Sequence, residues 1–364
     1  MGRPAISQKP SRGSEAGDTG VSTSKAATSY DVARLAGVSQ SAVSRCLTPG
    51  GSVSIATRAK VMKAIDSLGY RPNAIARSLI TQRSNMVAIV VANIGFHPEY
   101  TAYLSRSFSA RGLHVLLFTL DHEADADRVM DQIWQYRVDG VIAAVRLPPQ
   151  HIEMFAERRT PLIFLNRVYA DMPVNSVCCD QAEGERMLVD RLIAAGHRRF
   201  GIIKGPVDSV VSSQRVDEAV ARLRANGIAD VTLVAGDFDY ESGKRAFHTL
   251  VGLMGVPDAV VCANDMMAIG CMDAARYDLK LRVPDDVSVV GFDGMAQAYW
   301  ASFDLVTVRQ PTEAMVEAAV DMLMARVENP DLGTEKRMFS GELVTGTSAR
   351  LTMVVPPTRA TRRT

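Results

Sequence analysis

Two short helical patterns around a tight turn occupy residues 28–45, TSYDVARLAGVSQSAVSR. Thr28 and Asp31 have the spacing of a capping box, which predicts that a helix begins here. Apolar residues then recur at helical spacing up to Gly37, a residue that readily adopts the left-handed conformation at a helix end. Ser39 is suited to cap a second helix. The pattern therefore predicts a helical hairpin.

The second helix of the hairpin carries polar side chains on one face: Gln40, Ser41, Ser44 and Arg45. Side chains of this size and hydrogen-bonding capacity reach base edges in a DNA major groove. A third helical pattern runs from a cap at Ser54 to Gly69 and supplies the apolar residues that close a small core. An ordinary hairpin with a solvated polar face would show the same residues, so the pattern alone leaves both interpretations open.

A segment too short to fold alone follows the third helix. Pro72 disfavours helix at the residue before it, and Asn73 is a good cap for a helix over 74–79. A helix of under two turns is unstable in water, because nucleation costs more than so few hydrogen bonds return. We predict that it orders only against a partner, with Arg77 toward phosphate and Leu79 as an apolar wedge for a minor groove. A plain linker with a stray leucine is the alternative.

From Met86 onward, short apolar runs alternate with helical patterns. The runs are Met86–Val91, His114–Phe118, Val141–Val145, Leu162–Leu165, Phe200–Ile203, Thr232–Ala235, Ala259–Cys262 and Val287–Gly291. The helical patterns include Asp125–Tyr136, Ala182–Ala195, Gln214–Ala225 and Met266–Tyr277. Buried parallel strands joined by helices predict a doubly wound α/β fold, and so many strands predict two lobes with a cleft.

Charge divides the chain in the same way as the patterns. The first 83 residues hold 12 basic and 4 acidic side chains, whereas the remainder holds 29 basic and 36 acidic ones. A basic head on an acidic body fits a head that meets phosphate. Residues 1–27 have almost no apolar content and are predicted to be a disordered tail.

The five cysteines show no CxxC spacing, so we expect buried thiols of a reducing cytoplasm rather than disulfides or metal ligands. They are Cys46, Cys178, Cys179, Cys262 and Cys271. The sequence shows no apolar stretch near about 20 residues and no signal-peptide pattern, which predicts a cytoplasmic protein without membrane contact. No P-loop, GxSxG or zinc-helix motif occurs, so we expect no enzyme activity, no cofactor and no metal.

Two long stretches, TSYDVARLAGVSQSAVSRCL and VSIATRAKVMKAIDSLGYRPNAIARSL, resemble the DNA-binding head and hinge of the LacI/GalR family of bacterial transcription regulators. The stretches LIAAGHRRFGIIKGP, ANDMMAIG, VPDDVSVVGFD and VTVRQP resemble the periplasmic-binding-protein-like core of that family. The resemblance implies a small all-α helix-turn-helix head, a two-lobed α/β core, and a homodimeric regulator, most often a repressor. Its partners would be a pseudo-palindromic operator and a small-molecule effector.

The resemblance also implies roles for individual residues. Gln40, Ser41 and Arg45 would read bases, Tyr30 would seat the helix on the backbone, and Leu79 would be the minor-groove wedge. The complete predicted DNA-binding set is Thr28, Tyr30, Ser39, Gln40, Ser41, Ser44, Arg45, Asn73, Arg77 and Leu79.

The implied domains are a tail over 1–27, a helix-turn-helix domain over 28–71, a hinge helix and linker over 72–84, a core over 85–350 and a tail over 351–364. Within the core, one lobe would comprise about 85–179 and 309–335, and the other about 180–308 and 336–350. The chain would cross between lobes near Cys179–Asp180, near Arg309 and at 335–340.

Ligands of open α/β sheets bind beyond the carboxyl ends of the strands. The predicted effector-binding residues at these positions are Asn93, Phe96, His97, Asn166, Arg167, Phe238, Asn264 and Asp293. The resemblance adds Ser213 and Arg215, which follow the Gly205-Pro206 turn. Amides and carboxylates beside an aromatic face suit a sugar-like or polyol ligand. The resemblance places Asn166, Phe238, Asn264 and Asp293 in the effector pocket, although Asn264 and Asp265 are equally suited to cap a helix.

One departure from the family concerns the ligand. Many sugar-responsive members carry a ligand-gripping arginine where this chain has Ser213, and only Arg215 remains. This puts a simple hexose in doubt, because serine cannot make arginine's bidentate contact. Arg167 would instead favour an acidic or phosphorylated ligand. A regulator that has lost its effector, and a solute-binding receptor of the same fold, are the alternatives; the basic head argues against the receptor.

Overall fold

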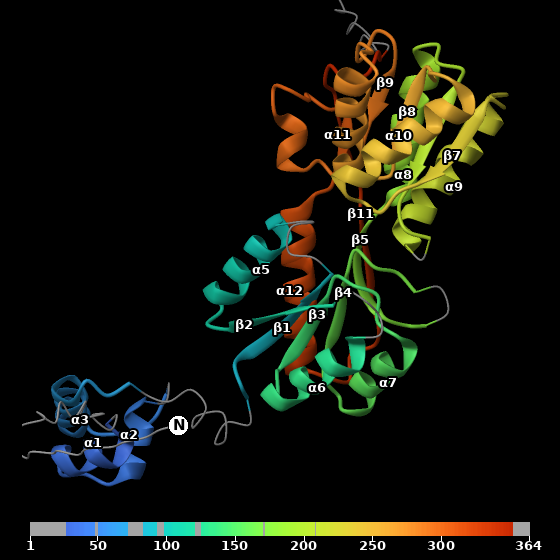
Figure 1. Cartoon of the computed structure of the whole chain (residues 1–364). Coiled ribbons are helices and arrows are strands. Elements are labelled where there is room, and N and C mark those ends of the chain that lie inside the picture. The colour runs from blue at the N-terminus through green and yellow to red at the C-terminus, as the bar shows by residue number, and fades with distance from the viewer. Residues whose placement is uncertain are drawn as a thin grey trace, which may run out of the picture. The chain divides into compact units, whose positions relative to one another are not determined.

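The computed structural model describes residues 27–47, 50–71, 83–92, 98–120, 125–169, 172–207 and 209–351. The chain divides into two compact units, Met1–Thr81 and Gln82–Thr364, whose elements are labelled in Figure 1. Several predictions lie outside the described residues: the two tails, the hinge helix with Asn73, Arg77 and Leu79, and the loop with Asn93, Phe96 and His97.

The described part of the first unit contains α1 (Ser29–Ala36), α2 (Gln40–Leu47) and α3 (Ile55–Leu68). The predicted capping box is formed, because Asp31 N–H donates to Oγ1 of Thr28 at 3.3 Å and Thr28 N–H donates to the Asp31 carboxylate at 3.0 Å. Gly37 ends α1 with a φ of 65°. The hairpin therefore has the local contacts that its sequence predicts.

A small apolar core joins the three helices. Val32, Val43 and Val61 are fully buried in it, one from each helix. Leu68 lies at helical spacing from Val61 but is 37% exposed, whereas Ala64 is buried in the core. The guanidinium of Arg58 on α3 donates to the carbonyl oxygens of Cys46 and Gly51 at 2.9 and 3.1 Å, which fixes α3 to the end of α2.

Replacing Arg58 by methionine is expected to lower the free energy of unfolding of the first unit by about 1–3 kcal/mol, because two carbonyl groups lose a charged donor. Hydrogen exchange of the α2 and α3 amides in the full chain measures this change. The matched control is Lys60→Met, which removes an exposed cation of the same helix. Equal losses in both variants would contradict the bracing role of Arg58.

The first lobe of the core is built on a parallel sheet in the order β11-β5-β4-β3-β1-β2. Its strands are β1 (Met86–Val91), β2 (His114–Thr119), β3 (Gly140–Ala143), β4 (Leu162–Leu165), β5 (Asn175–Cys179) and β11 (Lys336–Phe339). Alternate residues of β1 face opposite sides of the sheet. Val87 and Ile89 pack with α5 (Pro98–Ala110) and α12 (Thr312–Glu328). Their neighbours Ala88 and Val90 pack with α6 (Ala126–Tyr136) and α7 (Pro149–Glu157).

The second lobe repeats this layered arrangement on a smaller sheet. Its parallel strands lie in the order β7-β6-β8-β9, formed by β6 (Phe200–Lys204), β7 (Val231–Ala235), β8 (Ala259–Cys262) and β9 (Ser288–Val290). One face packs with α10 (Tyr240–Met254) and α11 (Asp265–Asp273), and the other with α8 (Gln181–Ala194) and α9 (Val210–Ala225). Helix α9 begins earlier than the predicted Gln214, because Ser209 caps it by accepting the Ser212 N–H. Figure 1 shows the two sheets as separate lobes of the core.

The chain crosses between the lobes three times, after β5, after β10 (Thr307–Arg309) and after β11. Strand β10 pairs with β12 (Glu342–Val344) beside the second sheet. One predicted boundary is wrong. The segment Lys336–Phe339, predicted to belong to the second lobe, pairs with β5 in the first sheet, so the third crossing follows Phe339.

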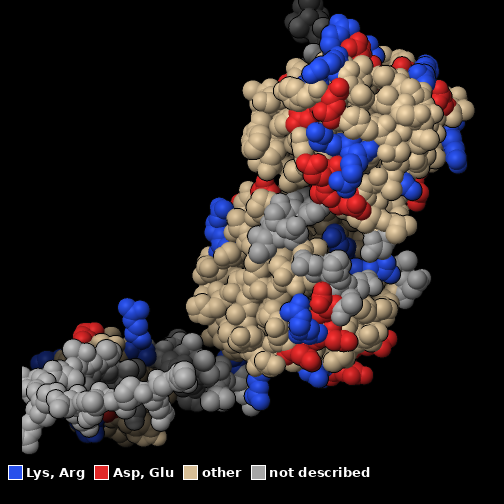
Figure 2. Space-filling view, in the orientation of Figure 1, with Lys and Arg blue, Asp and Glu red and all other residues tan. Residues whose placement is uncertain are grey.

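The five cysteines are buried free thiols, as predicted. On the face in Figure 2, acidic and basic side chains of the core lie close together. Ion pairs of this kind join Arg186 to Glu218 and Arg222 to Asp190. Among the described residues, no helix is long and apolar enough to cross a membrane and no cluster of His, Cys, Asp and Glu is suited to a metal ion.

Candidate functional site

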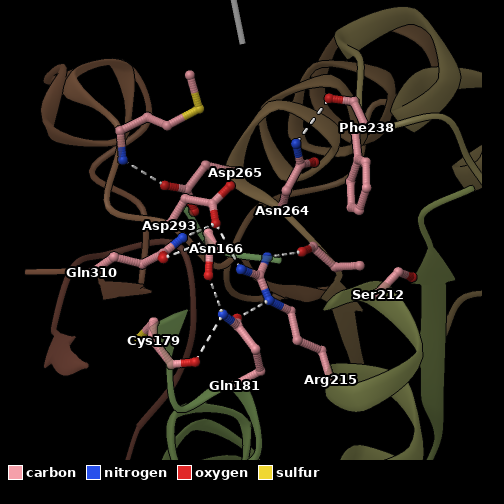
Figure 3. Close-up of polar contacts among 12 residues, drawn as sticks. Asn166, Cys179, Gln181, Ser212, Arg215, Phe238, Asn264, Asp265, Asp293 and Gln310 are labelled. Atoms are coloured by element: carbon pink, nitrogen blue, oxygen red, sulfur yellow. Dashed lines mark hydrogen bonds and ion pairs between the residues drawn. The ribbon is translucent and has the colours of Figure 1, made fainter. Parts of the chain in front are cut away.

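Five polar side chains from both lobes meet where the chain crosses between them, and Figure 3 shows them turned toward one another. We call this set the polar ring: Asn166, Gln181, Arg215, Asp293 and Gln310. Each of the five residues is at most 7% exposed. Buried polar groups are costly unless they are hydrogen-bonded, so the partners of each group decide whether this arrangement is stable.

Hydrogen bonds join the five side chains in a closed circuit. Nδ2 of Asn166 donates to Oε1 of Gln310 at 3.0 Å, and Nε2 of Gln310 donates to Oδ1 of Asp293 at 2.7 Å. Arg215 donates from Nη2 to the same Asp293 oxygen at 2.9 Å and from Nε to Oε1 of Gln181 at 2.8 Å. Nε2 of Gln181 completes the circuit by donating to Oδ1 of Asn166 at 2.9 Å. Because Asn166 follows a strand of the first lobe, the circuit links the lobes.

Arg215 is held on several sides. Besides its two bonds in the polar ring, its Nη1 donates to the carbonyl oxygen of Ala263 at the end of β8. Its Cζ lies 3.7 Å from the centroid of the Phe292 ring, a cation–π distance. The guanidinium therefore lies in a fixed plane with a carboxylate, an amide, a carbonyl and an aromatic face around it.

Three residues of this region have left-handed backbones. Asn166, Phe238 and Asp293 have φ values of 55°, 63° and 128°, although none of them is glycine. Each follows the carboxyl end of a strand, the edge at which open α/β sheets bind ligands. Such backbone strain persists only where the surroundings enforce it, and it is concentrated at functional sites.

An aromatic side chain lies near the polar ring, as Figure 3 shows for Phe238. The ring of Phe238 packs over Gly205, where an added Cβ would come within 2.4 Å of it. Asn264 holds the backbone of Phe238, because its Nδ2 donates to the Phe238 carbonyl oxygen at 2.8 Å. Its Oδ1 accepts the Met267 N–H at 3.0 Å and caps α11. The structure therefore shows the predicted capping role of Asn264, and its predicted role in the effector pocket stays a prediction.

Asp265 lies beside the polar ring but outside its circuit. Its carboxylate accepts the Met295 N–H at 2.8 Å and the Thr307 hydroxyl at 2.5 Å. Burial, reinforced by the negative charge of Asp293, raises the pKa of Asp265 to about 7. This residue ties α11 to the segment that leads into β10.

Helix α9 buries Ser212, Arg215 and Ala219 at helical spacing, and Ser213 lies on its exposed side. Ser213 is therefore not a member of the polar ring, and its effect on the choice of ligand stays a prediction. The spacing of the buried positions in α9 was a signal for this in the sequence.

Arg167 lies half-buried next to the polar ring. Its Nη1 donates to the carbonyl oxygen of its neighbour Asn166 at 2.8 Å, and burial lowers the pKa of its guanidinium. Arg167 thus supports the strained turn at Asn166.

Sequence reasoning missed Gln181 and Gln310. Each lies at a crossing between lobes, Gln181 at the start of α8 and Gln310 directly after β10. Gln310 also lies 3.4 Å from the hydroxyl of Tyr100 on α5, whose pKa is raised by burial. The predicted crossings near Cys179–Asp180 and Arg309 point to these neighbours, but an isolated glutamine does not reveal that it is buried.

In the first unit, the predicted DNA-reading face lies on the surface of α2. Ser41 and Arg45 are exposed, and Gln40 and Ser44 are half-buried. Oγ of Ser39 accepts the Ala42 N–H at 3.2 Å, which is the predicted cap. Tyr30 on α1 is 72% exposed. The face therefore presents a hydroxyl group and a guanidinium to solvent.

Comparisons with known proteins identify the family. Residues 28–73 match the family described as "Bacterial regulatory proteins, lacI family", and residues 189–349 match the "Periplasmic binding protein-like domain". The chain is 31% identical over 330 residues to the ribose operon repressor of Escherichia coli strain K12, covering 89% of this chain and 100% of that protein. This chain belongs to the LacI family.

Other LacI-family proteins are also similar to this chain. The chain is 30% identical over 331 residues to the probable HTH-type transcriptional repressor ExuR of Bacillus subtilis strain 168, covering 88% of this chain and 97% of that protein. A solved Lac repressor dimer bound to operator and the anti-inducer ONPF is similar, with a TM-score of 0.81, 28% identity and coverage of 89% and 99% of the two chains. A complex of the regulator CelR with cellobiose gives a TM-score of 0.67 at 30% identity, with coverage of 88% and 99%. As a LacI-family member, the chain is a DNA-binding transcriptional regulator and not an enzyme.

Proposed function

We propose that this LacI-family regulator represses transcription in the cytoplasm as a homodimer on a pseudo-palindromic operator, and that a small polyhydroxy molecule bound at the polar ring changes its affinity for that operator. The observation that carries the ligand part is the closed circuit of five buried polar side chains linking the lobes. A ligand that replaces these hydrogen bonds shifts the balance between lobe arrangements by its differential affinity for them.

The chemistry of the polar ring favours an uncharged ligand. Arg215 and Asp293 neutralise each other as an ion pair at 2.9 Å, and the other three members are amides. Amides and a carboxylate donate to and accept from hydroxyl groups, and the half-buried ring of Phe238 offers an aromatic face for a sugar. Similar proteins are named for ribose and for a cellobiose complex. We therefore place neutral pentoses and disaccharides ahead of sugar acids.

A thermal-shift screen of the full chain tests the ligand proposal. The panel holds ribose, glucose, cellobiose, galacturonate, nucleosides and nucleobases. Stabilisation by a neutral sugar that is lost in Asn166→Ala supports the proposal. Stabilisation only by acidic ligands would overturn the neutral class. Because the polar ring is already hydrogen-bonded within the chain, an effector-independent regulator is the second candidate, and a panel without any stabilising compound would favour it.

The DNA part of the proposal assigns base reading to Gln40, Ser41 and Arg45. Tyr30 and Ser44 would contact the DNA backbone beside them. Thr28 and Ser39 cap the helices that present them. The hinge residues Asn73, Arg77 and Leu79 complete the set, with Leu79 as the minor-groove wedge. A ligand would act by changing how the hinge segments of the two subunits meet the duplex.

Arg45→Ala is expected to reduce discrimination between operator and random DNA by about 1–3 kcal/mol, because an exposed guanidinium on α2 would lose a bidentate base contact. Titration of the operator recovered by genome-wide footprinting, against a scrambled duplex at the same salt concentration, measures the difference. The control is Arg34→Ala, an exposed arginine of α1 that pairs with Asp31. If Arg45→Ala weakens binding to both duplexes equally, the residue contacts phosphate.

A further inference from the structure

Glu185 is a buried carboxyl group that the proposed function does not use. It lies on α8, one turn after Gln181, and is only 1% exposed. Within the described residues, neither of its carboxyl oxygens has a hydrogen-bond partner. Its neighbours along the helix, Leu188 and Val189, belong to an apolar cluster of the second lobe. Burial without partners disfavours the charged form and raises the pKa of Glu185 to about 8.

Helix α8 packs against α9, β10 and β12. The charged residues of these three elements are Arg215, Asp217, Glu218, Arg222, Arg224, Arg309 and Glu342, and α8 itself adds Glu183, Arg186, Asp190 and Arg191. Arg309 and Glu342 pair with each other at the surface. Arg215 favours the ionised form of Glu185, and Glu218 disfavours it. Gln181, one turn before Glu185, bonds Arg215, and Gly184 packs against the Phe292 ring that the Arg215 guanidinium covers. The guanidinium of Arg215 is therefore the cation that an ionised Glu185 attracts.

The guanidinium of Arg215 cannot bind two carboxylates equally well. Its Nη2 bonds Asp293 and its Nε bonds Gln181, so both contacts belong to the polar ring. An ionised Glu185 would be a second anion for the same guanidinium.

We propose that Glu185 is a positioning residue for Arg215. The proton on the Glu185 carboxyl group decides whether the Arg215 guanidinium stays with Asp293 and Gln181. With the proton bound, Glu185 is neutral and the polar ring is closed. When the proton is released to solvent, the carboxylate draws Arg215 toward itself and the circuit loosens. The inference rests on the proposed function only in that the polar ring is taken as the effector site. Because the Glu185 proton controls the polar ring, the affinity for the effector depends on pH.

Nuclear magnetic resonance of the full chain, labelled with ¹⁵N-arginine, tests this directly. Arg215 is 2% exposed, and its Nε–H donates to Gln181. Both features protect the Nε–H proton from exchange with solvent. Its resonance is assigned by its loss in Arg215→Lys. Between about pH 6 and about pH 10, we expect the wild-type resonance to shift with a midpoint near the Glu185 pKa of about 8.

Three variants separate the outcomes. Glu185→Gln, and Glu185→Leu as a second neutral replacement, should each abolish the transition near pH 8. A change near pH 7, where Asp265 titrates beside Asp293, should remain in both variants. Glu218→Gln removes the charge that disfavours ionisation of Glu185, and should move the midpoint to lower pH while keeping the transition. A flat wild-type profile, or the same midpoint in Glu185→Gln, would overturn the proposal. The samples contain neither ligand nor DNA, so a negative ligand panel and a flat Arg215 profile are distinguishable failures.

Discussion

Replacing Arg215 by methionine is expected to lower the free energy of unfolding of the core by about 3–5 kcal/mol, the usual cost of breaking a buried ion pair from one side. Asp293 would keep a carboxylate that is 7% exposed and lose the guanidinium 2.9 Å away. Gln181 and the Ala263 carbonyl would lose donors as well. Urea unfolding monitored by circular dichroism measures the change, and any ligand found in the screen should no longer stabilise the variant.

The double variant Arg215→Met with Asp293→Asn separates the charge from the packing. Removing both charges of a buried pair costs far less than removing one, so most of the lost stability should return. A double variant no more stable than the single one would show that Arg215 contributes mainly through its contact with Phe292. A loss below about 1 kcal/mol in the single variant would mean that the core relaxes around Asp293.

Glu185→Gln is expected to raise the free energy of unfolding at pH 8 by about 4 kcal/mol and to change it by less than about 1 kcal/mol at pH 4. The folded chain holds the Glu185 proton up to a pKa of about 8, whereas the unfolded chain releases it near 4.5. The free energy of unfolding of the wild type therefore falls as pH rises through this interval. Glutamine does not ionise, so the Glu185→Gln variant keeps its stability over the same interval. Urea unfolding at both pH values measures the two differences.

The control for this prediction is Glu241→Gln, which neutralises an exposed glutamate at the start of α10. It should show no gain that grows with pH. A gain of the same size at pH 4 and pH 8 in Glu185→Gln would assign the effect to packing rather than to ionisation.

Local patterns predicted most of the fold because its strands are buried on both faces. Runs such as Leu162–Leu165 and Ala259–Cys262 coincide with β4 and β8. Four strands went unrecognised. Strands β10, β11 and β12 are short and partly exposed, and their partners lie far away in the sequence. Strand β5 is buried, but its sequence NSVCC holds only one of the large apolar residues that mark the other buried runs. A stretch such as Lys336–Phe339 carries no local signal that it pairs with β5, which explains the misplaced boundary.

The sequence allowed some members of the polar ring to be predicted and not others. Asn166 and Asp293 follow recognisable strands, so the rule for open α/β sheets located them. Gln181 and Gln310 depend on crossings whose tertiary contacts no local pattern encodes, and Glu185 reads as an ordinary polar position of a helix until its burial is known. Helical phase in α9 separates the buried Arg215 from the exposed Ser213, and residue type alone does not.

The second crossing, by which the chain returns to the first lobe, has a consequence for biosynthesis. When the ribosome has translated the chain only as far as residue 308, all four strands of the second sheet exist, but the first sheet still lacks β11 and the α12 helix that covers one of its faces. Val87 and Ile89, among the earliest core residues to emerge, must wait for residues made near the end of translation. The lobe encoded first is therefore the last to mature, and a nascent chain needs protection of that open face until its final helix arrives.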